Sequence, residues 1–186
     1  MVGGDADVES PAVRINYERQ VINPMDFKIR TLETRDIPFM REMVYQSLFV
    51  PEGQKPFPRS ILEEPFISKY VDGWREKSSD IGLIAERDNQ PIGAIWLRLF
   101  DEAHKGFGYV DDETPEITIA LIEEFRGNGI GTALMLELEA QAKNYGYRKL
   151  CLSVDPRNPV RRLYERFGYV HVGWCDTSWT MEKAVV

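Results

Sequence analysis

Residues 116–132 read EITIALIEEFRGNGIGT, and this stretch decides the fold. An apolar run leads into the glycine-rich hexapeptide RGNGIG at 126–131, and residues 132–145 follow with helical spacing. Glycines let the backbone approach a ligand closely and turn successive N–H groups the same way. The free N–H groups and positive dipole end of the following helix favour an anion at the same place. The stretch therefore predicts a strand, a phosphate-binding loop and a helix in succession.

Spacing separates the known kinds of phosphate-binding loop. A Walker A loop ends in Gly-Lys-Ser/Thr, whereas here Thr132 follows Gly131 directly, without a lysine. The dinucleotide fingerprint G-x-G-x-x-G/A, which would indicate a nicotinamide-dependent oxidoreductase, fails at its third small residue. The pattern R/Q-x-x-G-x-G/A is met by Arg126, Gly129 and Gly131. Taken alone, this motif still allows an ordinary sharp turn between a strand and a helix.

A second motif lies downstream, where residues 158–169 read NPVRRLYERFGY. With the glycine motif before it, this segment resembles the GNAT family of acyl-CoA-dependent N-acyltransferases, in which N-P-A-x-x-L-Y-E-x-x-G-F is usual. The departures are Val160 in place of alanine and Tyr169 in place of phenylalanine, and neither changes a group that performs chemistry. Residues 106–112, GFGYVDD, look like a bacterial branch of the family whose acceptors are unassigned.

The resemblance implies an α/β (α+β) fold with a mixed, mostly antiparallel central sheet of about seven strands and flanking helices. The implied order is β-α-α-β-β-β-α-β-α-β-β, with the strand at 117–122 diverging from the strand at 149–154. Apolar periodicity and turn residues give the same order independently. The expected strands are 27–33, 81–87, 91–100, 117–122, 149–154, 169–174 and 179–185, and the turn at 88–90 makes a hairpin of the second and third. The expected helices are 34–48 with Thr34 as N-cap, 60–74 with a kink or late start at Pro65, 132–145, and 158–167. Ile61, Phe66 and Tyr70 are expected on the buried side of the second helix.

Composition sets the expected organisation and setting of the chain. Residues 1–25 are expected to form a flexible tail and residues 26–186 one acetyltransferase domain. A formal net charge of -7 argues against nucleic-acid partners and against attraction to an anionic membrane. No signal-peptide pattern or apolar span is evident, which favours a cytoplasmic protein. Two cysteines are expected as free thiols, and His104 and His171 lack metal-ligand spacing, so no metal is expected.

The resemblance further implies acetyl-CoA as co-substrate. Pantetheine would pair with the strand edge at Leu121 and Ile122, and the pyrophosphate would lie on the N–H groups of residues 127–132. The cofactor-binding residues implied are Leu121, Ile122, Arg126, Gly127, Asn128, Gly129, Ile130, Gly131, Thr132 and Asn158. An asparagine before proline, as at position 158, is also an ordinary helix cap.

Aminolysis of a thioester needs a neutral amine and a proton for the departing thiolate. By the resemblance, Tyr164 supplies that proton and Glu116 deprotonates the amine; the alternatives are core packing for the tyrosine and simple solvation for the glutamate. Tyr109, Asp111 and Asp112 are rivals for the base, or bind the ammonium group of the substrate.

The sequence thus predicts direct transfer of an acetyl group from acetyl-CoA to a primary amine, either a small cationic amine or a peptide amine. The resemblance also allows a homodimer. The alternative is a CoA-binding regulatory or interaction module with the same fold and no turnover, against which the intact Tyr164 and Glu116 argue.

Overall fold

The computed structural model describes residues 27–185, and the tail predicted at residues 1–25 lies outside them. The predicted order of elements is confirmed, with 3-10 turns beside three of the helices. The strands are β1 Lys28–Thr31, β2 Ile81–Arg87, β3 Gln90–Arg98, β4 Glu116–Leu121, β5 Lys149–Val154, β6 Val170–Cys175 and β7 Ser178–Ala184. The helices are η1 Thr34–Asp36, α1 Ile37–Ser47, η2 Arg59–Glu63, α2 Pro65–Ser68, η3 Glu123–Phe125, α3 Ile130–Tyr145 and α4 Arg161–Arg166.

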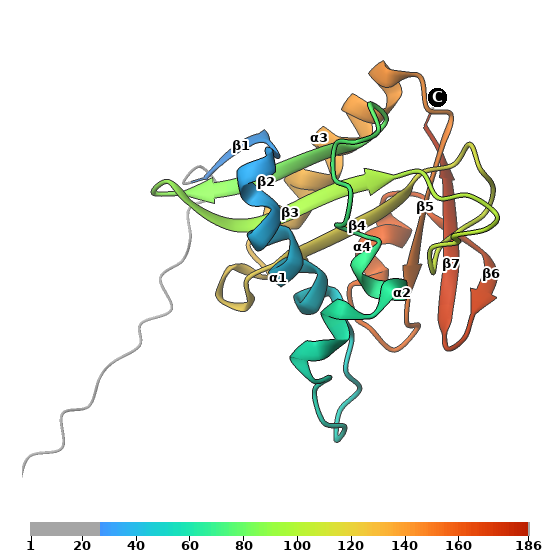
Figure 1. The fold of residues 1–186 in the computed structure, drawn as a ribbon, viewed down its shortest axis with the longest axis horizontal. Helices are drawn as coiled ribbons and strands as arrows, with labels where there is room; N and C mark the ends of the chain where they lie inside the picture. Colours follow the sequence, from blue (N-terminus) through green and yellow to red (C-terminus); the bar gives the residue numbers. More distant parts are fainter. Residues whose placement is uncertain (1–26, 186) are drawn as a thin grey trace, which may run out of the picture.

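A seven-stranded sheet with the order β1-β2-β3-β4-β5-β7-β6 forms the centre of the molecule (Figure 1). Every neighbouring pair is antiparallel except β4 and β5. The predicted β2–β3 hairpin turns through Asp88 and Asn89, both with positive φ, as a two-residue hairpin turn requires. This is the mixed, mostly antiparallel sheet that the sequence predicted.

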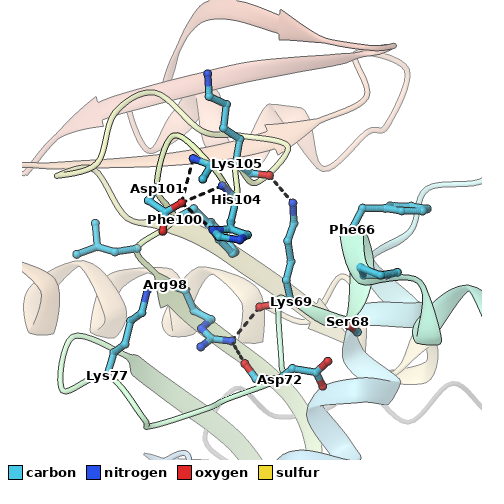
Figure 2. A pocket seen from close by; sticks show the side chains of 13 residues that line it. Phe66, Ser68, Lys69, Asp72, Lys77, Arg98, Phe100, Asp101, His104 and Lys105 are labelled. Carbon is cyan, nitrogen blue, oxygen red and sulfur yellow. Dashed lines mark hydrogen bonds and ion pairs between the residues drawn. The ribbon is translucent and has the colours of Figure 1, made fainter.

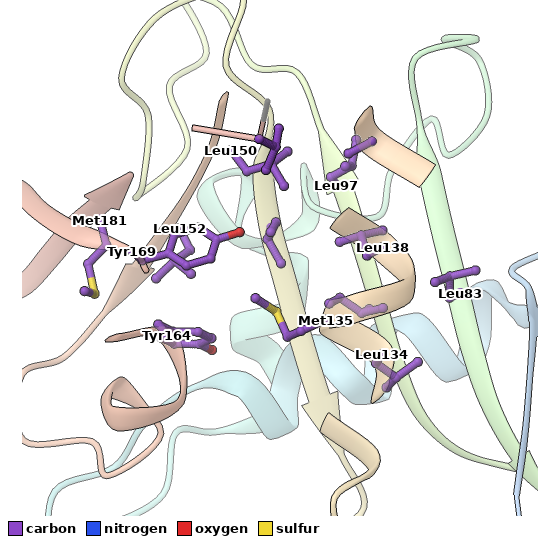
Figure 3. Packing of buried hydrophobic residues seen from close by; sticks show 14 of the residues in the cluster. Leu83, Leu97, Leu134, Met135, Leu138, Leu150, Leu152, Tyr164, Tyr169 and Met181 are labelled. Carbon is purple, nitrogen blue, oxygen red and sulfur yellow. The ribbon is translucent and has the colours of Figure 1, made fainter. Parts of the chain in front are cut away.

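Both faces of the sheet are covered, which explains why β3 reads as an almost unbroken apolar run. Ile95 and Leu97 of β3 pack in one core with α3 and α4, whereas Ala94 and Trp96 pack on the other face with α1 and the α2 region. Figure 1 shows α1 and α3 on opposite sides of the sheet. Figure 3 draws part of the α3 core.

The parallel pair β4 and β5 is joined at one rung, where Glu116 is paired with Cys151. The Cys151 N–H donates to the Pro115 carbonyl at 3.0 Å beside that rung. Beyond it the two strands separate, as predicted. The separation leaves the β4 edge towards the glycine loop without a strand partner on that side.

The segment 60–74, predicted as one helix with a kink or late start at Pro65, forms two short helices followed by turns. Glu64 is extended before Pro65, because the ring of a proline disfavours helical backbone in the residue before it, so the segment breaks into η2 and α2. After α2 the chain continues as turns, held by the Arg98 guanidinium, which donates to the Lys69, Asp72 and Gly73 carbonyls. These bonds to a β3 side chain replace the bonds of a continuing helix.

Two smaller predictions near these helices are also wrong. Phe66, expected on the buried side, is 47% exposed, and Ile67 occupies the core in its place. Thr34 is not the N-cap of the first helix. Glu33 is the N-cap of η1, where its N–H donates to the Asp36 carboxylate at 2.9 Å, and Asp36 is the N-cap of α1.

Within residues 27–185, no helix is both long and apolar enough to cross a membrane. Cys151 and Cys175 are free thiols, as predicted.

Candidate active site

The glycine loop has the backbone conformation that its sequence predicts. Gly127 and Gly129 have φ values of 77° and 82°, in the region that side chains disfavour, and Gly129 is the N-cap of α3. A Cβ built on either glycine would meet nothing within 4 Å, so this side of the loop is open. Ile130 is fully buried and fixes the first turn of α3 in the core. The loop therefore combines an anchored helix start with exposed backbone, which fits a pyrophosphate group.

The two residues expected to meet pantetheine, Leu121 and Ile122, point their backbone groups in opposite directions. The Ile122 N–H donates to the Ile92 carbonyl of β3 at 3.0 Å, so it faces away from the opening between β4 and β5. Because backbone groups alternate along a strand, those of Leu121 point the other way, into that opening. Of the two predicted residues, Leu121 therefore directs its backbone into the opening, where its carbonyl accepts the Arg126 Nε–H at 3.1 Å and its N–H lies on the same side.

Arg126 is held by protein groups. Its Nε donates to the Leu121 carbonyl at 3.1 Å, and its Nη2 donates to the Gln46 side chain of α1 at 3.0 Å. The Asn128 side chain donates to the Arg126 carbonyl at 3.1 Å. These contacts fasten the glycine loop to the end of β4 and to α1.

The second motif meets the glycine loop in space. A Cβ built on Gly131 would lie 3.8 Å from both Leu121 of β4 and Leu163 of α4. Asn158 lies in the turn before α4, where its Oδ1 accepts the Val160 N–H at 3.1 Å. The N-cap of α4 is Val160, so the helix-cap interpretation of Asn158 is wrong, and its amide nitrogen takes no part in this bond. Thr132 is exposed on the first turn of α3. The two sequence motifs thus flank one opening.

Tyr164 of α4 is 6% exposed and belongs to the core that Figure 3 draws. Its ring lies edge-on to that of Tyr169, with centroids 6.3 Å apart. Burial raises the pKa of the Tyr164 hydroxyl, which keeps the proton on the phenol at neutral pH. The side chain therefore packs in the core and also carries a proton to give.

Glu116 is not solvated, although it begins a strand. It is 4% exposed, and its Oε1 accepts the Tyr70 hydroxyl at 2.9 Å. Burial raises the pKa of Glu116 to about 7, while the Tyr70 hydroxyl, the Gly108 backbone and Lys69 oppose the shift. Among the described residues Oε2 has no hydrogen-bond partner. A carboxylate with a pKa near 7 can take up and release a proton at neutral pH.

The three predicted residues of the acidic loop make hydrogen bonds within the loop. The Tyr109 hydroxyl donates to Asp112 at 2.5 Å, and Asp111 accepts the Glu113 N–H at 3.0 Å. The side chains of Asp112 and Glu113 are exposed. Two carboxylates of this loop therefore face solvent, while Asp111 stabilises the turn.

A pocket of about 520 Å³ lies between the α2 region and the loop after β3 (Figure 2). Its charged lining is mainly basic and comprises Lys69, Lys77, Arg98, His104, Lys105, Asp72 and Asp101. Burial lowers the pKa of Lys69, whose Nζ lies 5.6 Å from the Phe100 ring centroid. No motif in the sequence indicates this pocket.

Two residues beside Glu116 were missed as parts of the site. Tyr70 was expected only as a core residue of a helix, and it lies 46 positions from Glu116 in the chain. Gly106 lies against the carboxylate, because a Cβ built there would be 1.9 Å from Oε2. The pair of glycines around Phe107 was the one local signal of such a close approach.

A seven-stranded sheet whose parallel pair opens beside a glycine loop is the arrangement that the resemblance to acyl-CoA-dependent N-acyltransferases implies. The family model described as the acetyltransferase (GNAT) family matches residues 40–169, and the chain belongs to this family.

Solved structures with the same fold include three acetyltransferases. An N-acetyltransferase from Staphylococcus aureus Mu50 is 19% identical, with a TM-score of 0.62, over 86% of this chain and 99% of that chain. The PaiA N-acetyltransferase from Thermoplasma acidophilum, solved in complex with coenzyme A, is 21% identical with a TM-score of 0.63 and the same coverages. The spermidine/spermine N-acetyltransferase SpeG from Vibrio cholerae, in mutant forms, is 18% identical with a TM-score of 0.57, over 86% of this chain and 94% of that chain.

Proposed function

We propose that this acetyltransferase moves an acetyl group from acetyl-CoA directly to a primary amine, with Glu116 as the base and Tyr164 as the acid. The observation that carries the proposal is the buried Glu116 carboxylate, with Oε2 unpartnered among residues 27–185, at the rung where β4 and β5 separate. Burying a carboxylate without a charged partner lowers the stability of the fold. Such groups with shifted pKa values cluster at functional sites, where they serve in proton transfer.

The cofactor fits the residues around the opening. The N–H groups of residues 127–132 would hold the pyrophosphate, the Leu121 backbone would pair with pantetheine, and Asn158 and Thr132 would supply further polar contacts. When bound, acetyl-CoA supplies the activated acetyl group. Arg126 supports the loop through its bonds to Leu121 and Gln46. Its guanidinium would also bind the phosphates of the cofactor.

The proposed proton transfers balance. Glu116 takes one proton from the ammonium form of the acceptor, which frees the nitrogen lone pair. A bond forms between that nitrogen and the acetyl carbon while the carbon–sulfur bond breaks. Tyr164 gives its proton to the departing thiolate and regains one from the nitrogen. The products are the amide, the CoA thiol and one proton released through Glu116.

We propose a small cationic amine or a peptide amine as the acceptor. The exposed carboxylates of Asp112 and Glu113 on the loop that leads to β4 support this choice, because they attract a cation. Such attraction is screened over about 8 Å at physiological ionic strength. The KM of a cationic acceptor should therefore rise with salt, and rise less in Asp112→Asn/Glu113→Gln.

The basic pocket beside Lys69 and Lys77 favours the opposite kind of acceptor, one that carries a carboxylate. Acetylation rates of a panel of amines, measured at two salt concentrations, distinguish a cationic acceptor from one that carries a carboxylate. If acidic amino acids alone are acetylated, the proposed cationic acceptor is wrong and the pocket is the place to look for the acceptor.

The experiment on the base is the pH–rate profile of Glu116→Gln, with Glu137→Gln as a matched control on the exposed side of α3. The wild-type rate should rise as Glu116 ionises through its pKa of about 7. Glu116→Gln should lose that limb and recover activity only at high pH, where the amine is neutral unaided. A profile of Glu116→Gln like that of wild type would refute the role. Absence of thiol release with every amine would favour a binding module instead.

A further inference from the structure

We propose that Tyr70 is a positioning residue for acetyl transfer, which holds the Oε1 atom of Glu116 and leaves Oε2 as the oxygen that takes the proton of the amine. The inference rests on the proposed role of Glu116 as the base. It adds a residue from the α2 region, on the opposite face of the sheet from Tyr164.

The hydrogen bonds around the Tyr70 hydroxyl fix its direction. The Phe107 N–H donates to Oη at 2.7 Å, and Oη lies 2.9 Å from Glu116 Oε1. With an N–H group pointing at its oxygen, the hydroxyl directs its own proton to the carboxylate. Hydrogen bonding of this kind favours the ionised form of an acid. Tyr70 therefore keeps Glu116 available as a base despite its burial.

The position of Tyr70 is determined from several sides. Its carbonyl accepts the Trp96 Nε1–H of β3 at 3.0 Å, and Arg98 of the same strand binds the carbonyls on both sides of it. Its ring stacks on Phe107 at an interplanar angle of 6° and meets Phe100 edge-on at 5.1 Å. A hydroxyl held by this many contacts loses little freedom when it binds the carboxylate.

The other oxygen of the carboxylate lies against Gly106. A side chain at this position would displace Oε2, since a Cβ would be 1.9 Å away. The remaining titratable groups that act on Glu116 are Lys69, which favours its ionised form, and the thiols Cys151 and Cys175. Burial raises the pKa of both thiols, so they are neutral where Glu116 titrates. Lys69 remains in the Tyr70 variant, so a change in that variant reports the hydroxyl.

The test is the pH–rate profile of Tyr70→Phe with acetyl-CoA and the best amine found in the panel. Loss of the hydroxyl should move the acid limb to higher pH by roughly one to two units, with the rate approaching wild type above it. The KM for acetyl-CoA should not change. Tyr147→Phe is the matched control, because the Tyr147 hydroxyl donates to the Ser79 carbonyl at 3.1 Å instead.

The outcomes separate the two ideas. If Glu116→Gln keeps the wild-type profile, the role of Glu116 itself fails. If Glu116→Gln loses the acid limb while Tyr70→Phe keeps it unmoved, Glu116 is the base and the inference about Tyr70 is overturned. A rate of Tyr70→Phe that falls equally at every pH, with a lower melting temperature, also overturns it, because a purely structural role acts in that way.

Discussion

At the scale of single residues, the proton on Tyr164 has a measurable consequence. Tyr164→Phe keeps the ring in the core and removes the proton donor, so turnover should fall about 100-fold to 10,000-fold. Affinity for acetyl-CoA should be unchanged, as calorimetry can check. Tyr169→Phe is the control, since its ring lies 6.3 Å away in the same core. Unchanged turnover of Tyr164→Phe, with chemistry limiting the rate, would leave the tyrosine as packing alone.

At the scale of elements, the junction between the glycine loop and α3 carries the prediction for cofactor binding. Gly129→Val places a branched side chain in the open side of the loop and strains a backbone with φ of 82°. Affinity for acetyl-CoA should drop markedly in calorimetry. Gly53→Val is a matched control, because Gly53 has φ of 80° and equally open surroundings outside the site. Equal affinities of the two variants would refute the assignment of the glycine loop as the pyrophosphate site.

The elements also show how far the sequence could be interpreted. The two motifs sit on the strand–loop–helix unit of β4 and α3 and on α4, where local signals and tertiary structure agree. The segment 60–74 could not be predicted, because its turns depend on the guanidinium of Arg98, a residue more than twenty positions away. Likewise, nothing in the sequence beside Glu116 indicates that Tyr70 contacts it, and the glycines around Phe107 are the one sign that the backbone approaches it closely. The segments that carry the motifs could be predicted, whereas the contacts that set the pKa of Glu116 could not.

At the scale of the whole molecule, the buried Glu116 links activity to stability. Its pKa is raised from 4.5 to about 7, so the folded state binds the proton more tightly than the unfolded chain. The stability this proton contributes is complete below pH 4.5 and is lost as the pH rises to about 7, by about 3 kcal/mol. Denaturant titrations should show that Glu116→Gln removes this fall. If the free energy of unfolding of wild type and Glu116→Gln changed with pH in the same way, Glu116 would not be the source of this pH dependence.

Because β4 and β5 are paired at a single rung, the sheet consists of two antiparallel parts, or ribbons. One ribbon contains β1, β2, β3 and β4, and the other contains β5, β7 and β6. The two ribbons share a hydrophobic core. The pantetheine chain proposed to bond to the β4 edge would act as an additional strand and join the two ribbons. Hydrogen exchange should slow at Leu121 and along β5 when acetyl-CoA is added. The melting temperature should rise with it, since ligand at 100 times its Kd stabilises a fold by about 2.7 kcal/mol. The cell's supply of acetyl-CoA would then set how firmly the two ribbons are held together.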